Sequence, residues 1–143
     1  MPNMKLLYDY ALSFIGLPYI WGGDDAVAGF DCSGLVQELL AAIGADPAGD
    51  QNAQTLHDHF LANGKLGVMG LGALVFYGKS TKEISHIVMM LDDKSCIGAD
   101  GGGSTTVDRA AAIKANAFVK VRPFDYRKDM VAIVMPDYQK LAP

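Results

Sequence analysis

The sequence predicts an α+β fold in which N-terminal helices pack on a central antiparallel β-sheet. Apolar residues recur with helical spacing as far as Asn63, whereas β-rich apolar runs separated by polar turns follow in the rest of the chain. Helices that precede the strands, rather than alternating with them, are typical of this fold class. The chain has 143 residues, half of them hydrophobic, so we expect residues 1–143 to form one domain.

Three segments before Asn63 have the spacing of amphipathic helices. The first ends at Gly16, the second covers residues 33–43 and the third covers residues 53–63. Apolar residues at every fourth position of the second segment indicate a helix with a wide buried face. The residues expected to face the core are Leu35, Leu39 and Ile43 in the second helix and Leu56, Phe60 and Leu61 in the third.

The second half of the chain contains several runs with the composition of strands. They cover residues 73–77, 84–91, 95–99, 117–124 and 130–135. A polar turn joins the first two runs, as expected for neighbouring strands of an antiparallel sheet. In a regular strand successive side chains alternate between faces, so one face of the second run should carry Ile84, His86, Val88 and Met90.

The charge of the chain argues against nucleic acid as a partner. The net charge is −4 and the 12 basic residues are scattered, whereas a phosphate-binding surface needs clustered Lys and Arg. The one local knot, "YRKD" at 126–129, is interpreted as a solvated face. No apolar run is long enough to span a bilayer, and the N-terminal segment lacks the pattern of a signal peptide. We therefore expect synthesis in the cytoplasm without an export signal, and no disulfide between Cys32 and Cys96.

One cysteine lies where a nucleophile is expected. Cys32 stands in "FDCSG", between an aspartate and a serine and immediately before the predicted helix of residues 33–43. The free N–H groups and the dipole at a helix N-terminus lower the pKa of a nearby thiol and can stabilise an oxyanion. A neighbouring imidazolium lowers that pKa further. Cys96 lies within a predicted strand and is interpreted as a core residue.

The base for such a thiol has to be one of the 3 histidines. His57 and His59 are two positions apart on a predicted helix, where they point in different directions, so we interpret both as solvated surface residues. His86 lies in the middle of the strand run "ISHIVMML". Its pattern fits a satisfied core histidine and a catalytic base equally well.

The segments "PYIWGG", "GFDCSGLVQ", "GALVFYG" and "SHIVMML" closely resemble the NlpC/P60 family of papain-like cysteine peptidases. The resemblance extends over about residues 5–105. It implies a papain-like fold and cleavage of the stem peptides of bacterial cell walls, typically between D-glutamate and the next, diamino, residue. It also implies that Cys32 is the nucleophile and that His86 is the general base.

Further site residues follow from the same resemblance. Tyr19 resembles the tyrosine that lines the family's site and can donate to the oxyanion. Asp31 and Ser33 resemble the pair that contacts the polar end of the stem peptide, and Trp21 fits core packing and a substrate wall equally well. The family's third polar residue, often a histidine that orients the base, falls on Gly98 in this sequence.

Glycine has no side chain with which to hold an imidazole, so another group has to orient His86. Asp100 lies two residues beyond Gly98 and shares its strand face if the strand continues. Its carboxylate can accept the second imidazole N–H and fix the tautomer. The alternatives are a loop residue at position 100, with a backbone carbonyl as the orienting group, or a weak enzyme.

Three functions are compatible with these residues. The first is a cysteine peptidase that hydrolyses peptidoglycan stem peptides without a metal or other cofactor, because no ligand cluster has zinc spacing. The second is an inactive module that binds wall peptides or forms part of a larger particle, and the third is an amidase or acyltransferase with the same dyad. The resemblance implies action at the cell wall, and the missing export signal fits a phage tail or lysis protein.

Overall fold

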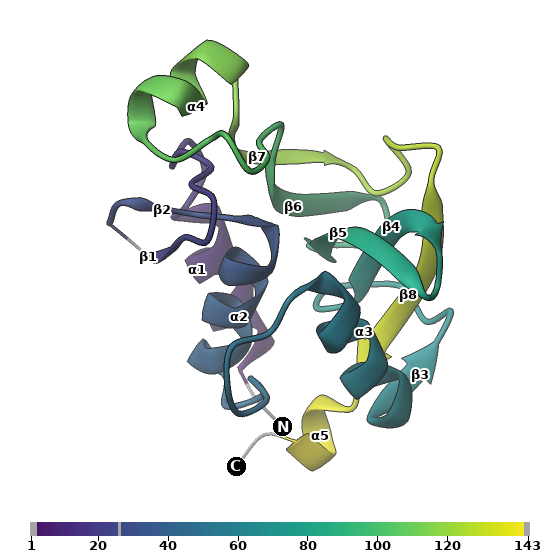
Figure 1. Cartoon of the computed structure of the whole chain (residues 1–143). Helices are drawn as coiled ribbons and strands as arrows, with labels where there is room; N and C mark the ends of the chain where they lie inside the picture. Colours follow the sequence, from purple (N-terminus) through teal and green to yellow (C-terminus); the bar gives the residue numbers. More distant parts are fainter. Residues whose placement is uncertain (1–2, 26, 142–143) are drawn as a thin grey trace.

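The computed structural model describes residues 3–25 and 27–141 and shows helices packed against a β-sheet (Figure 1). The helices are α1 (Met4–Leu12), α2 (Cys32–Ala42), α3 (Ala53–Ala62), α4 (Arg109–Ala115) and α5 (Tyr138–Leu141). The strands are β1 (Asp24–Asp25), β2 (Gly29–Phe30), β3 (Gly64–Leu66), β4 (Leu74–Ser80), β5 (Glu83–Met90), β6 (Ser95–Asp100), β7 (Phe118–Pro123) and β8 (Met130–Pro136). The predicted α+β fold class is confirmed, and every predicted strand run overlaps a strand of the structure.

Strands β3 to β8 form one antiparallel sheet in the order β3-β8-β4-β5-β6-β7, while β1 and β2 pair separately. Strands β4 and β5 occupy its centre and are joined by the predicted polar turn. Helices α2 and α3 pack against β5 (Figure 1). The short elements β1, β2, β3, α4 and α5 have no counterpart in the sequence prediction, because each is too brief to show a periodic pattern.

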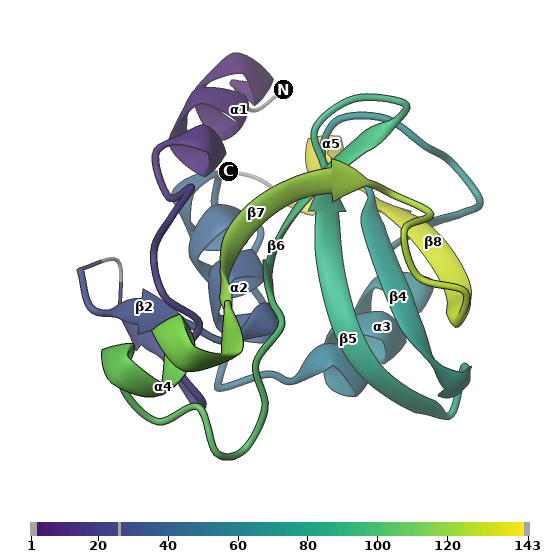
Figure 2. The same cartoon turned by 90° about the horizontal axis from the view of Figure 1, so that it is seen from above.

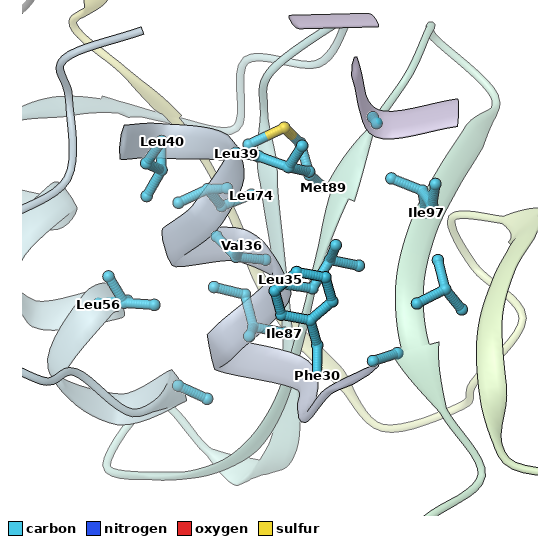
Figure 3. Packing of buried hydrophobic residues seen from close by; sticks show 14 of the residues in the cluster. Phe30, Leu35, Val36, Leu39, Leu40, Leu56, Leu74, Ile87, Met89 and Ile97 are labelled. Carbon is cyan, nitrogen blue, oxygen red and sulfur yellow. The ribbon is translucent and has the colours of Figure 1, made fainter. Parts of the chain in front are cut away.

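Helix α2 carries the centre of the core (Figure 3). Its fully buried side chains Leu35 and Leu39 lie against Ile87 and Met89 of β5, as the helical spacing predicts. Truncation of a buried leucine typically costs about 2–5 kcal/mol, so α2 is held firmly on the sheet. The same packing fixes the position of the first residue of α2, which is Cys32.

Helix α3 buries two of its three predicted core residues. Leu56 and Phe60 are fully buried, whereas Leu61 is 49% exposed, so the prediction for Leu61 is wrong. Successive residues of an α-helix are rotated by about 100°, which places position 61 roughly 140° around the axis from position 56. Leu61 therefore cannot share the buried face.

A β-bulge in the β4–β5 hairpin changes the face of one predicted residue. His86 pairs with Tyr77, but Ile84 pairs with Gly78, so Ser85 is the extra residue. Ile84 consequently packs against the helix-side core, and the prediction that it shares a face with His86 is wrong. The other two residues predicted for that face do lie together in a cluster on the opposite side of the sheet, and they are Val88 and Met90.

The sheet opens between β5 and β6. The two described strands pair at Met89 with Ile97 and at Met90 with Cys96, and their shared ladder ends there. Beyond that point β5 follows β4, while β6 follows β7 as far as Asp100, so the two strands diverge (Figure 2). Helix α2 packs against both strands, and its N-terminal residue lies at the opening.

Candidate active site

A cavity of about 420 Å³ occupies the opening between β5 and β6. It is lined by Tyr19, Cys32, Ser85, His86, Asp100, Gly101, Gly102 and Arg127. The structure therefore brings the predicted nucleophile, base, orienting carboxylate and lining tyrosine around one space. Their catalytic roles stay predictions.

Cys32 is fixed at a helix N-terminus by the residues on either side of it. It is the first residue of α2, and Asp31 caps the helix by accepting the Gly34 N–H at 2.7 Å. The other carboxylate oxygen of Asp31 accepts the Gly22 N–H at 3.1 Å, which ties the preceding loop to the helix. Gly34 permits this close approach, because a Cβ at that position would lie 2.0 Å from the Gly23 carbonyl oxygen.

The thiol of Cys32 has a raised pKa, contrary to the sequence prediction. Burial, followed by the negative charge of Asp31, raises the pKa of Cys32 to about 11. Backbone N–H groups of Ile87, Ser33 and Cys32 itself act in the opposite direction but do not outweigh burial. The prediction fails because burial of the thiol outweighs the helix dipole, and the capping carboxylate beside it acts in the same direction as burial. The resting thiol is therefore neutral at physiological pH.

The raised pKa predicts how Cys32 reacts with iodoacetamide. In a Cys96→Ala variant, we expect the alkylation rate of Cys32 to rise about tenfold per pH unit between about pH 7 and pH 10, because only the thiolate reacts. Mass spectrometry of quenched samples measures this rate. The matched Cys32→Ala variant should react more slowly, because Cys96 is 1% exposed and burial raises its pKa to about 12. A rate for Cys32 that stays constant down to about pH 6 would indicate a thiolate–imidazolium pair and contradict the prediction.

His86 presents a neutral imidazole to the cavity. Its ring centroid lies 5.5 Å from that of Tyr77, and its Nε2 lies 2.9 Å from the hydroxyl oxygen of Tyr126. Burial lowers the pKa of His86 to about 4, although the charge of Asp100 acts in the opposite direction. Among the residues that the structure describes, none forms a hydrogen bond with Nδ1. The sulfur of Cys32 accepts the backbone N–H of Ile87, the residue that follows His86.

Strand β6 continues to Asp100, as the prediction for this residue requires. Asp100 pairs with Phe118, so it shares a strand face with Gly98. One carboxylate oxygen of Asp100 lies 3.6 Å from His86 Nε2, which is longer than a hydrogen bond, and the other lies 3.2 Å from Arg122 Nε. Asp100 is thus beside the imidazole without a direct hydrogen bond to it.

Position 98 has no room for a side chain. A Cβ at Gly98 would lie 2.5 Å from Cγ1 of Val88. We expect Gly98→Ala to lower the free energy of unfolding by about 1–3 kcal/mol, a typical cost of overpacking. The matched control is Gly103→Ala, because a Cβ there meets no atom within 4 Å. Urea denaturation compares the variants, and equal stability of the two would contradict the prediction.

Tyr19 is held at the cavity wall by its backbone and by a glycine. Its N–H donates to the Ala117 carbonyl at 3.0 Å, and its ring lies so close to Gly102 that a Cβ there would be 2.1 Å from Tyr19 Cδ1. Burial, with the charges of Cys32 and Asp31 adding to it, raises the pKa of Tyr19. The hydroxyl therefore keeps its proton and is able to donate it.

The other predicted substrate-binding residues do not line the 420 Å³ cavity. Ser33 is 8% exposed and its hydroxyl donates to Asp31 at 3.3 Å, so both side chains have partners within the protein. Trp21 is 54% exposed and lies at the surface. Their roles in substrate binding stay predictions.

Segment 126–129 contributes two residues near the candidate base that sequence reasoning missed: Arg127 lines the cavity, and Tyr126 contacts His86 from outside it. Tyr126 and Arg127 are half-buried, so the interpretation of this segment as a solvated face is wrong for both. Tyr126 reaches the imidazole of His86, and Arg127 lines the cavity with its guanidinium fixed by two hydrogen bonds to Asp129 of 2.9 and 2.7 Å. The one signal in the sequence is the aromatic residue Tyr126 beside three charged residues, because a fully solvated loop gains no stability from an aromatic ring.

The other histidines lie away from the cavity, but one is not a surface residue. His57 is 3% exposed, so its interpretation as solvated is wrong. Its ring packs edge-on against Phe76 at 5.1 Å, and its Nδ1 lies 2.9 Å from the Asp58 carboxylate. The buried face of α3 is simply wider than the apolar residues alone indicate. His59 is half-buried, so the prediction of a solvated surface residue holds for it only in part.

Three further observations hold for residues 3–25 and 27–141. No group of three or more His, Cys, Asp or Glu side chains is placed to hold a metal ion. No helix has the length and apolar character needed to cross a membrane. Cys32 and Cys96 are not joined in a disulfide, and the interpretation of Cys96 as a core residue is confirmed.

The fold and the cavity define an α+β protein that presents a cysteine at a helix N-terminus near an imidazole on a strand. The model of the NlpC/P60 family matches residues 16–122, which is most of the chain. This chain belongs to the NlpC/P60 family.

Individual relatives agree with this family. The chain is 38% identical over 81 residues to the bifunctional muramidase/DL-endopeptidase CwlT of Bacillus subtilis (strain 168), a match covering 54% of this chain and 23% of CwlT. The chain thus spans about a quarter of that relative. The NlpC/p60 domain of the peptidoglycan hydrolase SagA has a TM-score of 0.67 at 25% identity, covering 92% of this chain and 97% of that domain. An NlpC/P60 family protein of Bacillus cereus ATCC 10987 has a TM-score of 0.70 at 21% identity, covering 92% and 39%.

Proposed function

We propose that residues 1–143 act as one catalytic domain, a cysteine peptidase that hydrolyses the stem peptides of peptidoglycan. The observation that carries this proposal is that Cys32 and His86 line the same cavity, with Cys32 at the N-terminus of α2. Membership in the NlpC/P60 family supports it. The similarity to CwlT, which is named a DL-endopeptidase, and to the domain of SagA, which is named a peptidoglycan hydrolase, supports it further.

The proposed reaction begins from a neutral thiol and a neutral imidazole. Because the pKa of Cys32 is raised to about 11 and that of His86 is lowered to about 4, the resting pair is uncharged at pH 7. His86 Nδ1 takes the thiol proton while the sulfur attacks the scissile carbonyl carbon. The carbonyl oxygen of the resulting tetrahedral intermediate becomes an oxyanion. The backbone N–H of Cys32 and the hydroxyl of Tyr19 are the donors proposed to stabilise it.

The second half of the reaction returns the enzyme to its starting state. The C–N bond breaks as His86 gives its proton to the leaving amine, which leaves a thioester on Cys32. Water then attacks the thioester carbonyl, with its proton passing to His86, and the acid product leaves as the thiol regains that proton. Every proton transfer in this sequence uses Nδ1, since Nε2 is engaged by Tyr126.

We propose the bond between D-glutamate and the following diamino residue as the target. The test is to incubate purified peptidoglycan fragments with the protein and to identify the products by mass spectrometry. The expected products are a stem that ends in D-glutamate and a peptide with a new free amine on the diamino residue. Release of the stem from the sugar would instead identify an amidase. Unchanged fragments would favour an inactive module that binds wall peptides.

The proposed substrate places the activity at the bacterial cell wall. The predicted association with phage tail or lysis proteins stays a prediction, because it depends on the sequence context alone.

A further inference from the structure

Two side chains lie near Nε2 of His86, the candidate base, and the hydroxyl of Tyr126 is the closer of them. It lies 2.9 Å from His86 Nε2, whereas the nearest oxygen of Asp100 lies 3.6 Å away. The first distance is that of a hydrogen bond and the second is not. A tyrosine hydroxyl can donate one proton and can also accept one, so this contact alone is compatible with either tautomer of His86.

The other neighbour of the hydroxyl decides its direction. The carboxylate of Asp100 borders the same small space as Tyr126, and its nearest oxygen lies 3.6 Å from His86 Nε2, the atom that the hydroxyl contacts. Burial raises the pKa of Tyr126, and the charge of Asp100 adds to it. Because a carboxylate only accepts hydrogen bonds, its charge favours the orientation in which the Tyr126 proton points toward Asp100. The phenolic oxygen is then left to accept the N–H of His86 Nε2. In this tautomer Nδ1 has a free lone pair.

Arg122 contacts both Asp100 and Tyr126, the two side chains near Nε2 of His86. Its Nε lies 3.2 Å from the second carboxylate oxygen of Asp100, and its guanidinium carbon lies 5.1 Å from the centre of the Tyr126 ring. The contact with Arg122 limits movement of the Asp100 carboxylate, and the contact with the ring limits rotation of Tyr126. These side chains therefore form a continuous chain from Arg122 through Asp100 and Tyr126 to His86.

The glycine at position 98 leaves space for this arrangement. Tyr126, Asp100 and Arg122 surround the same small space as Gly98 and Val88. A side chain at position 98 would meet Val88 and project into the space that Tyr126 borders. Gly98 of β6 thus leaves room beside the imidazole that Tyr126, from the segment after β7, borders.

We propose that Tyr126 is the positioning residue for His86, with Asp100 and Arg122 directing its hydroxyl so that the imidazole carries its proton on Nε2. This role rests on the proposed function, because a base at Nδ1 is needed only if Cys32 is the nucleophile. Asp100 then acts on the imidazole through Tyr126, which refines the sequence prediction of a direct contact.

The tautomer of His86 can be measured without any substrate. Long-range ¹H–¹⁵N NMR correlations of the ¹⁵N-labelled protein at pH 7 are expected to show His86 protonated on Nε2. In Tyr126→Phe the ring contacts remain but the acceptor oxygen is lost, so the Nδ1–H form should appear in a substantial fraction. Tyr138→Phe is the matched control, because it removes another buried hydroxyl, one that donates to Gly72. An Nδ1–H tautomer in the wild type, or no change in Tyr126→Phe, would overturn the proposal.

A second test compares kcat and KM, because loss of a residue with only a structural role would not lower kcat selectively. Tyr126→Phe should lower kcat between about 10- and 100-fold, a part of the ~10²–10⁴ that a general base contributes, with KM unchanged. Asp100→Asn should act through the same hydroxyl, so the double variant should be little worse than either single variant. Effects that multiply would show that the two residues act independently and would overturn the relay.

The two readouts separate this proposal from the proposed function. If the protein cleaves no stem peptide but the tautomer responds to Tyr126→Phe as expected, the positioning role stands and the peptidase assignment fails. If cleavage depends on Cys32 but Tyr126→Phe changes neither the tautomer of His86 nor kcat, the peptidase assignment stands and the positioning role fails.

Discussion

Replacement of Cys32 by alanine is expected to abolish cleavage of peptidoglycan stem peptides, lowering kcat/KM by at least about 10³-fold. Removal of the nucleophile from a thiol or hydroxyl peptidase leaves only the residual catalysis due to binding and the oxyanion donors, and losses of up to about 10⁶-fold are known. Alanine suits the first turn of a helix, and the Asp31 cap does not involve the side chain of Cys32. The variant should therefore fold, and product release followed by mass spectrometry should detect no cleavage.

The matched control for this variant is Cys96→Ala. Cys96 is buried in the cluster on the far side of the sheet and does not line the cavity, so its replacement should cost some stability but no activity. Circular dichroism checks that both variants are folded before their rates are compared. Wild-type cleavage by Cys32→Ala would end the assignment of Cys32 as the nucleophile, and equal losses in both variants would point to a structural cause.

The sequence predicts well those elements whose composition or spacing alone matches their burial. The four-residue spacing of α2 identifies its buried face, and the continuous apolar runs of β4 and β5 identify central strands that are buried on both faces. The prediction fails where geometry depends on pairing rather than on pattern. The bulge at Ser85 moves Ile84 to the other face, and only the register of β5 against β4 reveals it.

The residues of the candidate site divide in the same way. Cys32 and His86 are recognisable because each stands in a distinctive local motif. Tyr126 is not, since its motif is a short charged loop and its contact with His86 spans 40 positions of sequence. The contact exists because β6 and β7 carry the chain away from β5 and the segment after β7 then returns over the same face.

The pKa of Cys32 shows the limit of local reasoning more clearly. A helix N-terminus favours a thiolate, and the sequence places Cys32 there. The cost of burial depends on how closely Tyr19, β5 and the end of β6 surround the sulfur, which is a property of the assembled cavity. In this protein that cost dominates, so activation of the thiol has to come from proton transfer to His86 during attack.

Replacement of His86 by glutamine is therefore the second decisive change, with an expected loss in kcat/KM of about 10²–10⁴-fold at pH 7. Glutamine keeps a polar side chain of similar length near Tyr126 but cannot take the thiol proton. Without the base, only the thiolate fraction of Cys32 reacts. Because the pKa of Cys32 is raised to about 11, the residual rate should rise about tenfold per pH unit through the alkaline range.

The wild type should have a different pH profile, and the sign follows from the pKa of His86. The base works only when neutral, and its pKa is lowered to about 4, so kcat/KM should stay level near neutrality and fall as the pH drops through about 4. The imidazole of the unfolded chain titrates near pH 6.5, so acid between these two values also favours unfolding, and stopped assays must be normalised to the folded fraction. An acid limb near pH 6.5 in the folded enzyme would mean that His86 is more exposed to water than its burial indicates. A rate for His86→Gln with the same level profile as the wild type would show that another group accepts the proton.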